Sequence, residues 1–212
     1  AKTLFWLFCI YFGFIFIYAD PFAKGAADSA SYAAKLIRLH NNHPSFYALV
    51  TSFYNKDEGI VDIYDPIVSW LVSMFSGDPR WLFVIYAAVF GYFYTNNLWI
   101  IYNTISKRIG LILFTFMLAY ALINPIWNIN GVRMYTAAHV FIYGILQYFL
   151  LNKKKGLIWT FSSFLFHFSF LFPVSVLLFW FIVPKRAILL FSFYIIGSII
   201  KEIDLFEVRN FL

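Results

Sequence analysis

The stretch that decides the fold is Asn124 to Asn152, NPIWNINGVRMYTAAHVFIYGILQYFLLN. It begins with a polar segment that a proline kinks, and it continues as one long apolar helix, predicted over Val132 to Leu151. Arg133 lies near the start of this helix, and the cluster of Lys153, Lys154 and Lys155 follows its end. An arginine one turn inside an apolar span is costly and is usually placed to meet an anion or a carboxylate. The rest of the chain has to supply that partner.

The composition indicates a membrane protein. Of the 212 residues, 62% are hydrophobic and 12% are charged, and a soluble domain of this size cannot bury so much apolar surface. The apolar runs are too long for the strands of a membrane barrel. We therefore predict an all-α polytopic membrane protein with about six to eight membrane segments, some of them short, re-entrant or broken. We expect a single transmembrane domain over residues 1–212, and the first residue, Ala1, leaves room for an upstream segment.

Breaker residues divide the chain into apolar runs. Between the first two runs, an external loop of about residues 20–60 contains a predicted amphipathic helix from Asp28 through His40 that lies along the membrane face. Its apolar side carries Tyr32, Leu36 and Leu39. His167 and Pro173 interrupt the run from Gly156 to Val183, which is predicted to be two short helices. The runs are Thr3 to Ala19, Ile63 to Phe75, Trp81 to Tyr102, Leu111 to Ile123, Val132 to Leu151, Gly156 to Val183 and Ala187 to Ile200.

The basic residues set the orientation. The net charge of +6 is carried largely by lysines and arginines in short loops, which is the pattern of cytoplasmic loops rather than of a nucleic-acid-binding surface. With Lys107-Arg108, Lys153 to Lys155 and Lys185-Arg186 in the cytoplasm, Arg133 lies about 30 Å of helix away, near the outer surface. His167 and the external loop with Asp28 then face the same side. Two full spans between the external loop and Lys107-Arg108 would give the wrong parity, so either Ile63 to Phe75 is re-entrant or one basic pair is outside. We predict the first, because that segment is short and begins at Asp65-Pro66.

Several residues have both a structural and a functional interpretation. Arg133 either reaches to the interface or binds an anion, and the small residues along its helix face suit close helix packing or a slot for a lipid tail. His167 either bonds a backbone carbonyl that Pro173 frees or takes part in catalysis. Asp28 either caps its helix or acts as a general base. Asp65, beside Pro66 at the mouth of an apolar segment, needs water or a partner. The small face comprises Ala137, Val140, Gly144 and Gln147.

The remaining candidates are weaker. We interpret His139 as a helix-packing residue, because it points away from Arg133 on the same helix. His40 and His43 lack the converging carboxylates of a metal site and are interpreted as loop residues. Cys9 is a packed, unpaired thiol inside the first apolar run. Trp127 and Tyr135 flank Arg133 and offer aromatic faces for stacking on sugar rings. We expect no cofactor and no resident metal, although a divalent cation beside Arg133 stays open.

Four motifs, in order, resemble the EpsG-like family of bacterial polysaccharide polymerases, which are of the Wzy type. Gly25 to Tyr32 is similar to the family's G-x-D-x-x-x-Y element, with Ala26 in place of a glycine. Tyr64-Asp65-Pro66 is similar to its Y-E-P element, and Gly131 to Ala137 to its I-R-Q-x-x-A helix start, with Met134 in place of glutamine. Lys153 to Lys155 with Phe166 to Ser169 resembles its basic loop and F-H-x-S element. The resemblance covers about Gly25 to Val183.

The resemblance implies a fold like that of the C-type glycosyltransferases. It also implies a glycosyl-transfer reaction. A glycan on a polyprenyl diphosphate would be transferred to a hydroxyl of another lipid-linked repeat unit, on the outer face of the bacterial cytoplasmic membrane, to build exopolysaccharide, capsule or O-antigen. Asp28, Arg133 and His167 are then the predicted catalytic residues, and we expect Arg133 to meet a lipid-borne diphosphate rather than a buried carboxylate. The predicted substrate-binding residues are Lys24, Tyr32, Asp65, Trp127, Asn130 and Tyr135.

Two other functions are compatible with the sequence. A transporter or flippase-like protein for a lipid-linked or anionic solute would use Arg133 as its binding site, and a non-catalytic subunit of a polysaccharide assembly complex would tolerate the loss of all three predicted catalytic residues. The expected partners are the lipid-linked oligosaccharide, membrane lipid and other polysaccharide-assembly proteins, and no nucleic acid.

Overall fold

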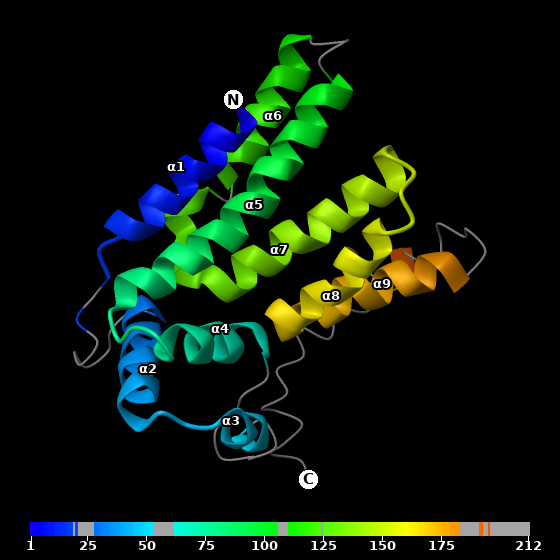
Figure 1. Cartoon of the computed structure of the whole chain (residues 1–212). Helices are drawn as coiled ribbons and strands as arrows, with labels where there is room; N and C mark the ends of the chain where they lie inside the picture. Colours follow the sequence, from blue (N-terminus) through cyan, green and yellow to red (C-terminus); the bar gives the residue numbers. More distant parts are fainter. Residues whose placement is uncertain are drawn as a thin grey trace. The chain divides into compact units, whose positions relative to one another are not determined.

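The computed structural model describes residues 1–18, 20, 28–52, 62–105, 110–123, 125–182, 191–192 and 195. Every regular element within these ranges is helical (Figure 1), which confirms the all-α part of the prediction. The chain divides into two compact units, Ala1–Leu171 and Phe172–Leu212. The residues discussed below as a candidate site belong to the first unit.

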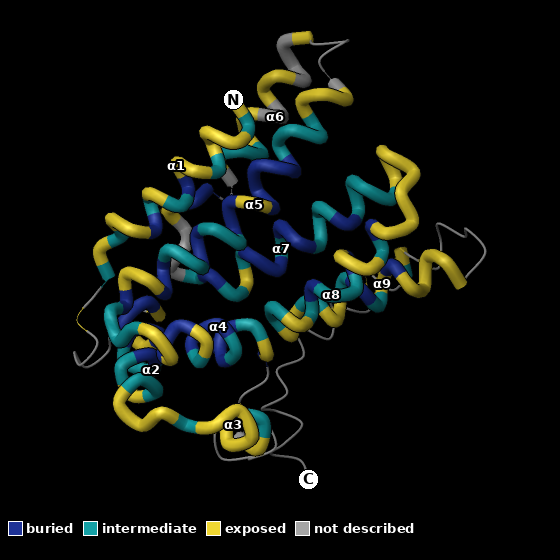
Figure 2. Tube along the Cα trace, in the orientation of Figure 1, coloured by how far each residue is buried: buried dark blue, intermediate teal, exposed yellow. Residues whose placement is uncertain are grey.

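Helix α5, Pro79–Ile105, is the central element of the first unit. Asp78 lies just before it and accepts a hydrogen bond from the backbone amide of Arg80 at 2.9 Å, which satisfies one of the free donors at the helix start. Helices α1, Lys2–Ile15, and α7, Val132–Ile145, pack against α5. Much of α5 is buried (Figure 2), and its residues in the hydrophobic core are Leu82, Phe83, Tyr86, Ala87, Phe90 and Tyr94.

Helix α1 is shorter than the predicted span of Thr3 to Ala19. It ends at Ile15, because Phe16 has extended backbone angles. The extended segment places the rings of Phe16 and Tyr18 on Phe83 of α5, with ring centroids 4.9 and 5.6 Å apart respectively. Packing of these aromatic rings against the core accompanies the early end of the helix, where hydropathy alone predicts that the helix continues.

Helix α2, Asp28–Asn42, corresponds to the predicted amphipathic helix, but its surroundings differ from the prediction. Ala30, Ala33 and Leu36 are fully buried, and α2 packs against α4, Tyr64–Ser73, and against α5. Its apolar face is therefore covered by protein, and the prediction that this face lies on the membrane is wrong. The short helix α3, Phe46–Ser52, follows after a break at His43 to Ser45.

The stretch from Asn124 to Asn152 contains three helical geometries. After α6, Leu111–Ile123, the kinked lead-in forms the 3-10 helix η3, Ile126–Gly131. Helix α7 begins directly at Val132, and its last turn is the π-helix η4, Leu146–Leu150. The lead-in and the helix start agree with the prediction, whereas the π turn carries no sequence signal that periodicity would detect.

Helix α8, Gly156–Phe166, ends at the predicted break. His167 has extended backbone angles, and the 3-10 turn η5, Phe168–Phe170, follows it. Helix α7 packs closely on α8. The two backbones are so near that a Cβ on Gly144 would overlap Thr160 and a Cβ on Gly156 would overlap the backbone of α7. Helix α9, Leu171–Ile182, contains Pro173 within its first turn, where a missing amide donor does no harm.

One helix among the described residues, Pro79–Thr104 within α5, is long and apolar enough to cross a membrane by length and composition. Three further apolar helices are shorter, at Lys2–Ile15, Gly156–Phe166 and Phe168–Ile182. The predicted segment Ala187 to Ile200 lies mostly outside the described residues.

Candidate functional site

Helix α2 presents two polar side chains on the face that packs toward α4 and α7. Tyr32 and Lys35 are three residues apart, so they lie on the same side of the helix. Tyr32 is 5% exposed, and its hydroxyl accepts a hydrogen bond from Arg133 Nε at 3.1 Å. Lys35 is a half-buried lysine whose Nζ lies 2.8 Å from Asp65 Oδ2. One helix face therefore contacts both an arginine and an aspartate from distant parts of the chain.

Arg133 lies in the first turn of α7, directly after η3, and three groups surround it. In addition to the Tyr32 hydroxyl, its Nη1 lies 3.0 Å from Asp62 Oδ2. The guanidinium carbon lies 5.7 Å from the centroid of the Tyr32 ring, which is within the range of a cation–π contact. The side chain of Arg133 is nevertheless 37% exposed, so part of the cation faces outward from the protein.

Asp62 is the carboxylate that the sequence analysis missed. Its side chain is 5% exposed, and its second oxygen, Oδ1, accepts a hydrogen bond from the backbone amide of Phe168 at 2.7 Å. The prediction that Arg133 has no buried carboxylate partner is therefore wrong. A signal was present in the sequence, because Asp62 stands between two β-branched apolar residues and a buried carboxylate needs a cation.

Asp65 is held by more partners than Asp62. Its Oδ2 pairs with Lys35, and its Oδ1 accepts hydrogen bonds from Tyr86 at 2.5 Å and from Ser69 at 3.1 Å. The predicted need of Asp65 for a partner is thus met inside the protein. With both oxygens engaged and only 7% of the side chain exposed, Asp65 is not placed to bind a substrate directly.

The electrostatics join these contacts into one group. Burial raises the pKa of Tyr32, and the charge of Arg133 and its hydrogen bond oppose that rise. The carboxylates of Asp28 and Asp65 raise the pKa of Tyr32 further. Asp28 itself is exposed in the first turn of α2. The group therefore contains two cations, two buried carboxylates and one exposed carboxylate.

His167 is connected to this group through the backbone. Its Nδ1 lies 2.7 Å from Ser169 Oγ and accepts a hydrogen bond from the Ser169 amide at 3.3 Å. Because Nδ1 accepts from that amide, the proton of the neutral imidazole sits on Nε2. The next residue, Phe168, donates its amide to Asp62, so the His167 bend and Arg133 lie on either side of a single carboxylate.

The other predicted substrate-binding residues are not all brought to Arg133. Trp127 is 57% exposed in η3. Tyr135 is half-buried and packs against the core, beside Gly131, rather than presenting an open ring face. Lys24 and the side chain of Asn130 lie outside the described residues.

The small-residue face of α7 is filled by protein. Ala137 and Val140 are fully buried, and Gly144 contacts α8 so closely that it has no room for a side chain. Of the two interpretations that the sequence allows, close helix packing agrees with the structure, and the slot for a lipid tail along this face is wrong.

The remaining histidines have structural contacts. His139 is 1% exposed, its ring packs edge-on against Phe90, and its backbone carbonyl accepts the Asn97 amide at 2.9 Å. His40 Nδ1 lies 2.6 Å from the carbonyl of Ser73. The contacts of His139 agree with its interpretation as a packing residue, whereas His40 lies within α2 and its interpretation as a loop residue is wrong. Within the described ranges, no three side chains of the metal-ligating types converge.

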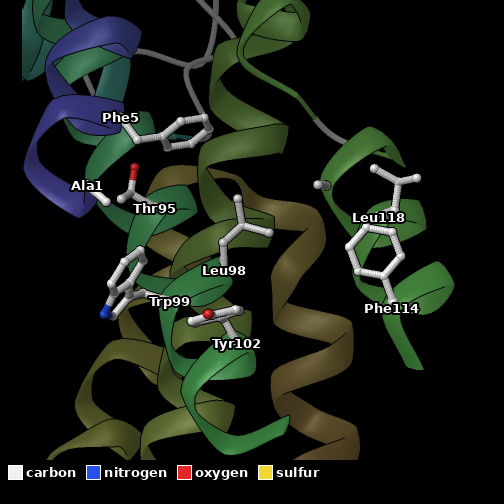
Figure 3. A pocket seen from close by; sticks show the side chains of 9 residues that line it. Ala1, Phe5, Thr95, Leu98, Trp99, Tyr102, Phe114 and Leu118 are labelled. Carbon is white, nitrogen blue, oxygen red and sulfur yellow. The ribbon is translucent and has the colours of Figure 1, made fainter. Parts of the chain in front are cut away.

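An apolar cavity of about 380 Å³ lies elsewhere in the first unit (Figure 3). Side chains from α1, α5 and α6 line it, among them Phe5, Leu98 and Leu118. No charged side chain is part of its wall, so it lacks a cationic side chain that would balance a phosphate. The cation-bearing group around Arg133 is therefore the better candidate for an anionic ligand. Comparison of the chain with protein-family models, with curated proteins and with solved structures finds no match.

Proposed function

We propose that this chain is a membrane polysaccharide polymerase that transfers a glycan from polyprenyl diphosphate to a hydroxyl of another lipid-linked repeat unit. The observation that carries the proposal is the half-exposed guanidinium of Arg133, held by Tyr32 and Asp62 in the first turn of an apolar helix. The ordered resemblance of four sequence motifs to the EpsG-like family supports the same reaction.

The membrane setting is part of the proposal. Large apolar side chains are exposed on α1 and α9, including Phe8, Tyr11 and Phe172. A water-soluble protein rarely leaves so many exposed without a partner. We place the chain in the bacterial cytoplasmic membrane as a multi-pass protein, with α5 as a full span and Arg133 toward the outer face. That location gives Arg133 access to a lipid-linked donor that enters from the side.

The role of Arg133 in the transfer follows from the charge that develops. When the bond between the anomeric carbon and the phosphate oxygen breaks, the lipid diphosphate leaves with the electron pair. A guanidinium bound to the diphosphate oxygens stabilises that added charge in the transition state. Lys35, one turn beyond Tyr32 and 27% exposed, adds a second positive charge to the field around the leaving group while it stays paired with Asp65.

The test is a substitution of Arg133 in cells that depend on this protein for their polysaccharide. With Arg133→Ala we expect loss of polymer and accumulation of single repeat units on the carrier at the outer face, measured by mass spectrometry of the extracted lipids. Arg80→Ala is the matched control, because Arg80 is an exposed arginine that pairs with Asp78 rather than with Asp62. Normal polymer in Arg133→Ala would refute the proposal and favour a non-catalytic subunit. Repeat units retained at the inner face would indicate transport instead.

A further inference from the structure

Asp62 holds Arg133 and the His167 bend together. Its Oδ2 lies 3.0 Å from Arg133 Nη1, and its Oδ1 accepts the Phe168 amide at 2.7 Å. The backbone next to Asp62 makes a second link to the same bend, because the Ile63 amide donates to the carbonyl of Leu165 at 3.2 Å. Asp62 therefore occupies a place on the guanidinium that an oxygen of a bound phosphate would take.

We propose that the diphosphate of the donor replaces Asp62 on Arg133, and that the displaced Asp62 carboxylate then accepts the proton of the acceptor hydroxyl as the general base of the transfer. This inference rests on the proposed function and adds to it a catalytic residue that the motifs of the sequence do not identify.

The replacement of Asp62 by the diphosphate on Arg133 is favourable. A diphosphate carries more negative charge than a carboxylate, and it can bind a guanidinium through two parallel hydrogen bonds. Arg133 is exposed enough to turn toward it, whereas Asp62 is almost fully buried. After the exchange, Asp62 keeps the Phe168 amide but loses its cation, and a buried carboxylate without a cation gains affinity for a proton. The base is therefore activated only when the donor is bound.

The charged groups around Asp62 support this change. Arg133 faces it from α7 and the Phe168 amide faces it from η5, while Tyr32 from α2 contacts the far side of the guanidinium. Lys35 does not replace Arg133 as the partner of Asp62, because its ammonium is paired with Asp65. The cation that faces Asp62 is therefore withdrawn when Arg133 binds the donor.

The bonds balance in the proposed step. The hydroxyl oxygen of the acceptor forms a bond to the anomeric carbon of the donor glycan, and its proton passes to a carboxylate oxygen of Asp62. The bond between the anomeric carbon and the diphosphate oxygen breaks, and the lipid diphosphate leaves with that electron pair, bound to Arg133. When the lipid diphosphate departs, Asp62 releases its proton to solvent and pairs with Arg133 again.

The other carboxylates are less suited to this role. Asp65 is bound by Lys35, Tyr86 and Ser69 through both oxygens, and a ligand on Arg133 displaces none of these three groups. Asp28 is exposed in the first turn of α2, so solvent screens it from a charge that arrives at Arg133. Only Asp62 directly loses a partner when the donor binds.

The first experiment uses the wild-type protein in detergent and needs no variant to fold. Inorganic pyrophosphate is the probe, and infrared difference spectra are recorded as it is added. We expect a new carboxylate stretching band, because the Asp62 carboxylate loses the guanidinium of Arg133 while it stays ionised, as a base must be before it accepts a proton. Pyrophosphate binding without such a band would overturn the inference while leaving the proposed function intact. Absence of pyrophosphate binding would overturn both.

The second experiment compares Asp62→Asn with Asp78→Asn. In the first variant the amide oxygen of the new side chain can still accept from the Phe168 amide, but it no longer competes as an anion for Arg133. We expect Asp62→Asn to bind pyrophosphate about tenfold more tightly than wild type in calorimetry, because the binding-competent guanidinium is no longer occupied, and to give no infrared band. Asp78→Asn, which removes the carboxylate of a separate aspartate–arginine pair, should bind like wild type.

The activity of the same two variants completes the test. Asp62→Asn should form no polymer despite its tighter binding, and Asp78→Asn should form polymer normally. Polymer formation by Asp62→Asn at the wild-type rate would overturn the assignment of Asp62 as the base. Equal or weaker pyrophosphate binding by a folded Asp62→Asn protein would overturn the exchange on Arg133.

Discussion

Asp62 and Asp65 are three residues apart, both are nearly buried and both pair with a cation, yet they are held in different ways. Asp65 is fixed by three side chains from α2, α4 and α5, two of which, Tyr86 and Ser69, are fully buried. Asp62 is fixed by one backbone amide and by an arginine that keeps more than a third of its side chain exposed. A buried carboxylate with many internal donors thus forms a structural ion pair. A buried carboxylate with few internal donors forms an ion pair that a ligand can open.

The largest expected effect comes from exchanging the two cations. Arg133→Lys should lower polymer formation by about a hundredfold, because an ammonium cannot bind a diphosphate through a planar pair of donors. Lys35→Arg should lower it little, since that position needs only a positive charge beside Asp65. Polymer yield and chain length on gels measure both variants. Equal losses in the two would mean that the pairs do not differ in function.

A large effect on stability is expected at Asp65. Asp65→Ala leaves the Tyr86 and Ser69 hydroxyls buried without their acceptor, and it should lower the free energy of unfolding by about 3 kcal/mol. The half-exposed Lys35 can turn to solvent and adds little to this loss. Asp62→Asn should lower it by about 1 kcal/mol, because an acceptor for the Phe168 amide remains. Denaturant unfolding in detergent compares the two, and the reverse order would contradict the comparison.

A smaller difference in stability is expected between substitutions of two tyrosines, Tyr86, which donates to Asp65, and Tyr32, which accepts from Arg133. Tyr86→Phe removes a donor from the buried Asp65 and should cost about 1 kcal/mol. Tyr32→Phe removes an acceptor of Arg133 Nε, which can instead bond water, and should cost about 0.5 kcal/mol while the cation–π contact remains. The same unfolding measurement applies. A larger loss for Tyr32→Phe would show that Arg133 is held more rigidly than its exposure indicates.

The smallest effect is expected at the surface pair of Asp78 and Arg80. Hydrogen bonds from Arg80 lower the pKa of Asp78, so the stabilisation is present above the ordinary range of an aspartate and is lost as the pH falls through the lowered pKa. In wild type the unfolding midpoint should therefore fall slightly more on acidification than it does in Asp78→Asn. An exposed ion pair contributes little to stability. A large change in the unfolding midpoint would mean that this pair stabilises the protein as much as the buried pairs do.

Much of the helical framework could be predicted from local signals. Asn124-Pro125, His167 and Asp78-Pro79 mark boundaries that the structure reproduces within a few residues, because prolines and helix caps act on their own segment. The end of α1 at Ile15 was predicted incorrectly, since it involves aromatic rings packing on Phe83, far along the chain.

The candidate site was predictable only in part. Arg133 is conspicuous because its charge conflicts with its surroundings, whatever the fold. Asp62 was overlooked, because its partners lie 71 and 106 residues away and no periodicity connects them. The covered face of α2 was missed for the same reason: an amphipathic pattern does not distinguish a helix that faces lipid from one that faces protein.

The contact between Gly144 and Gly156 fixes a distance relation within the hairpin of α7 and α8. Arg133 lies eleven residues before Gly144 and His167 lies eleven residues after Gly156, about 16 Å of helix in each case. From this contact the two helices run back along each other, and Arg133 and His167 lie equally far along their helices from it. A larger side chain at Gly144 or Gly156 would force α7 and α8 apart, so the register of the two predicted catalytic residues depends on a contact at the end of the hairpin that carries the lysine cluster.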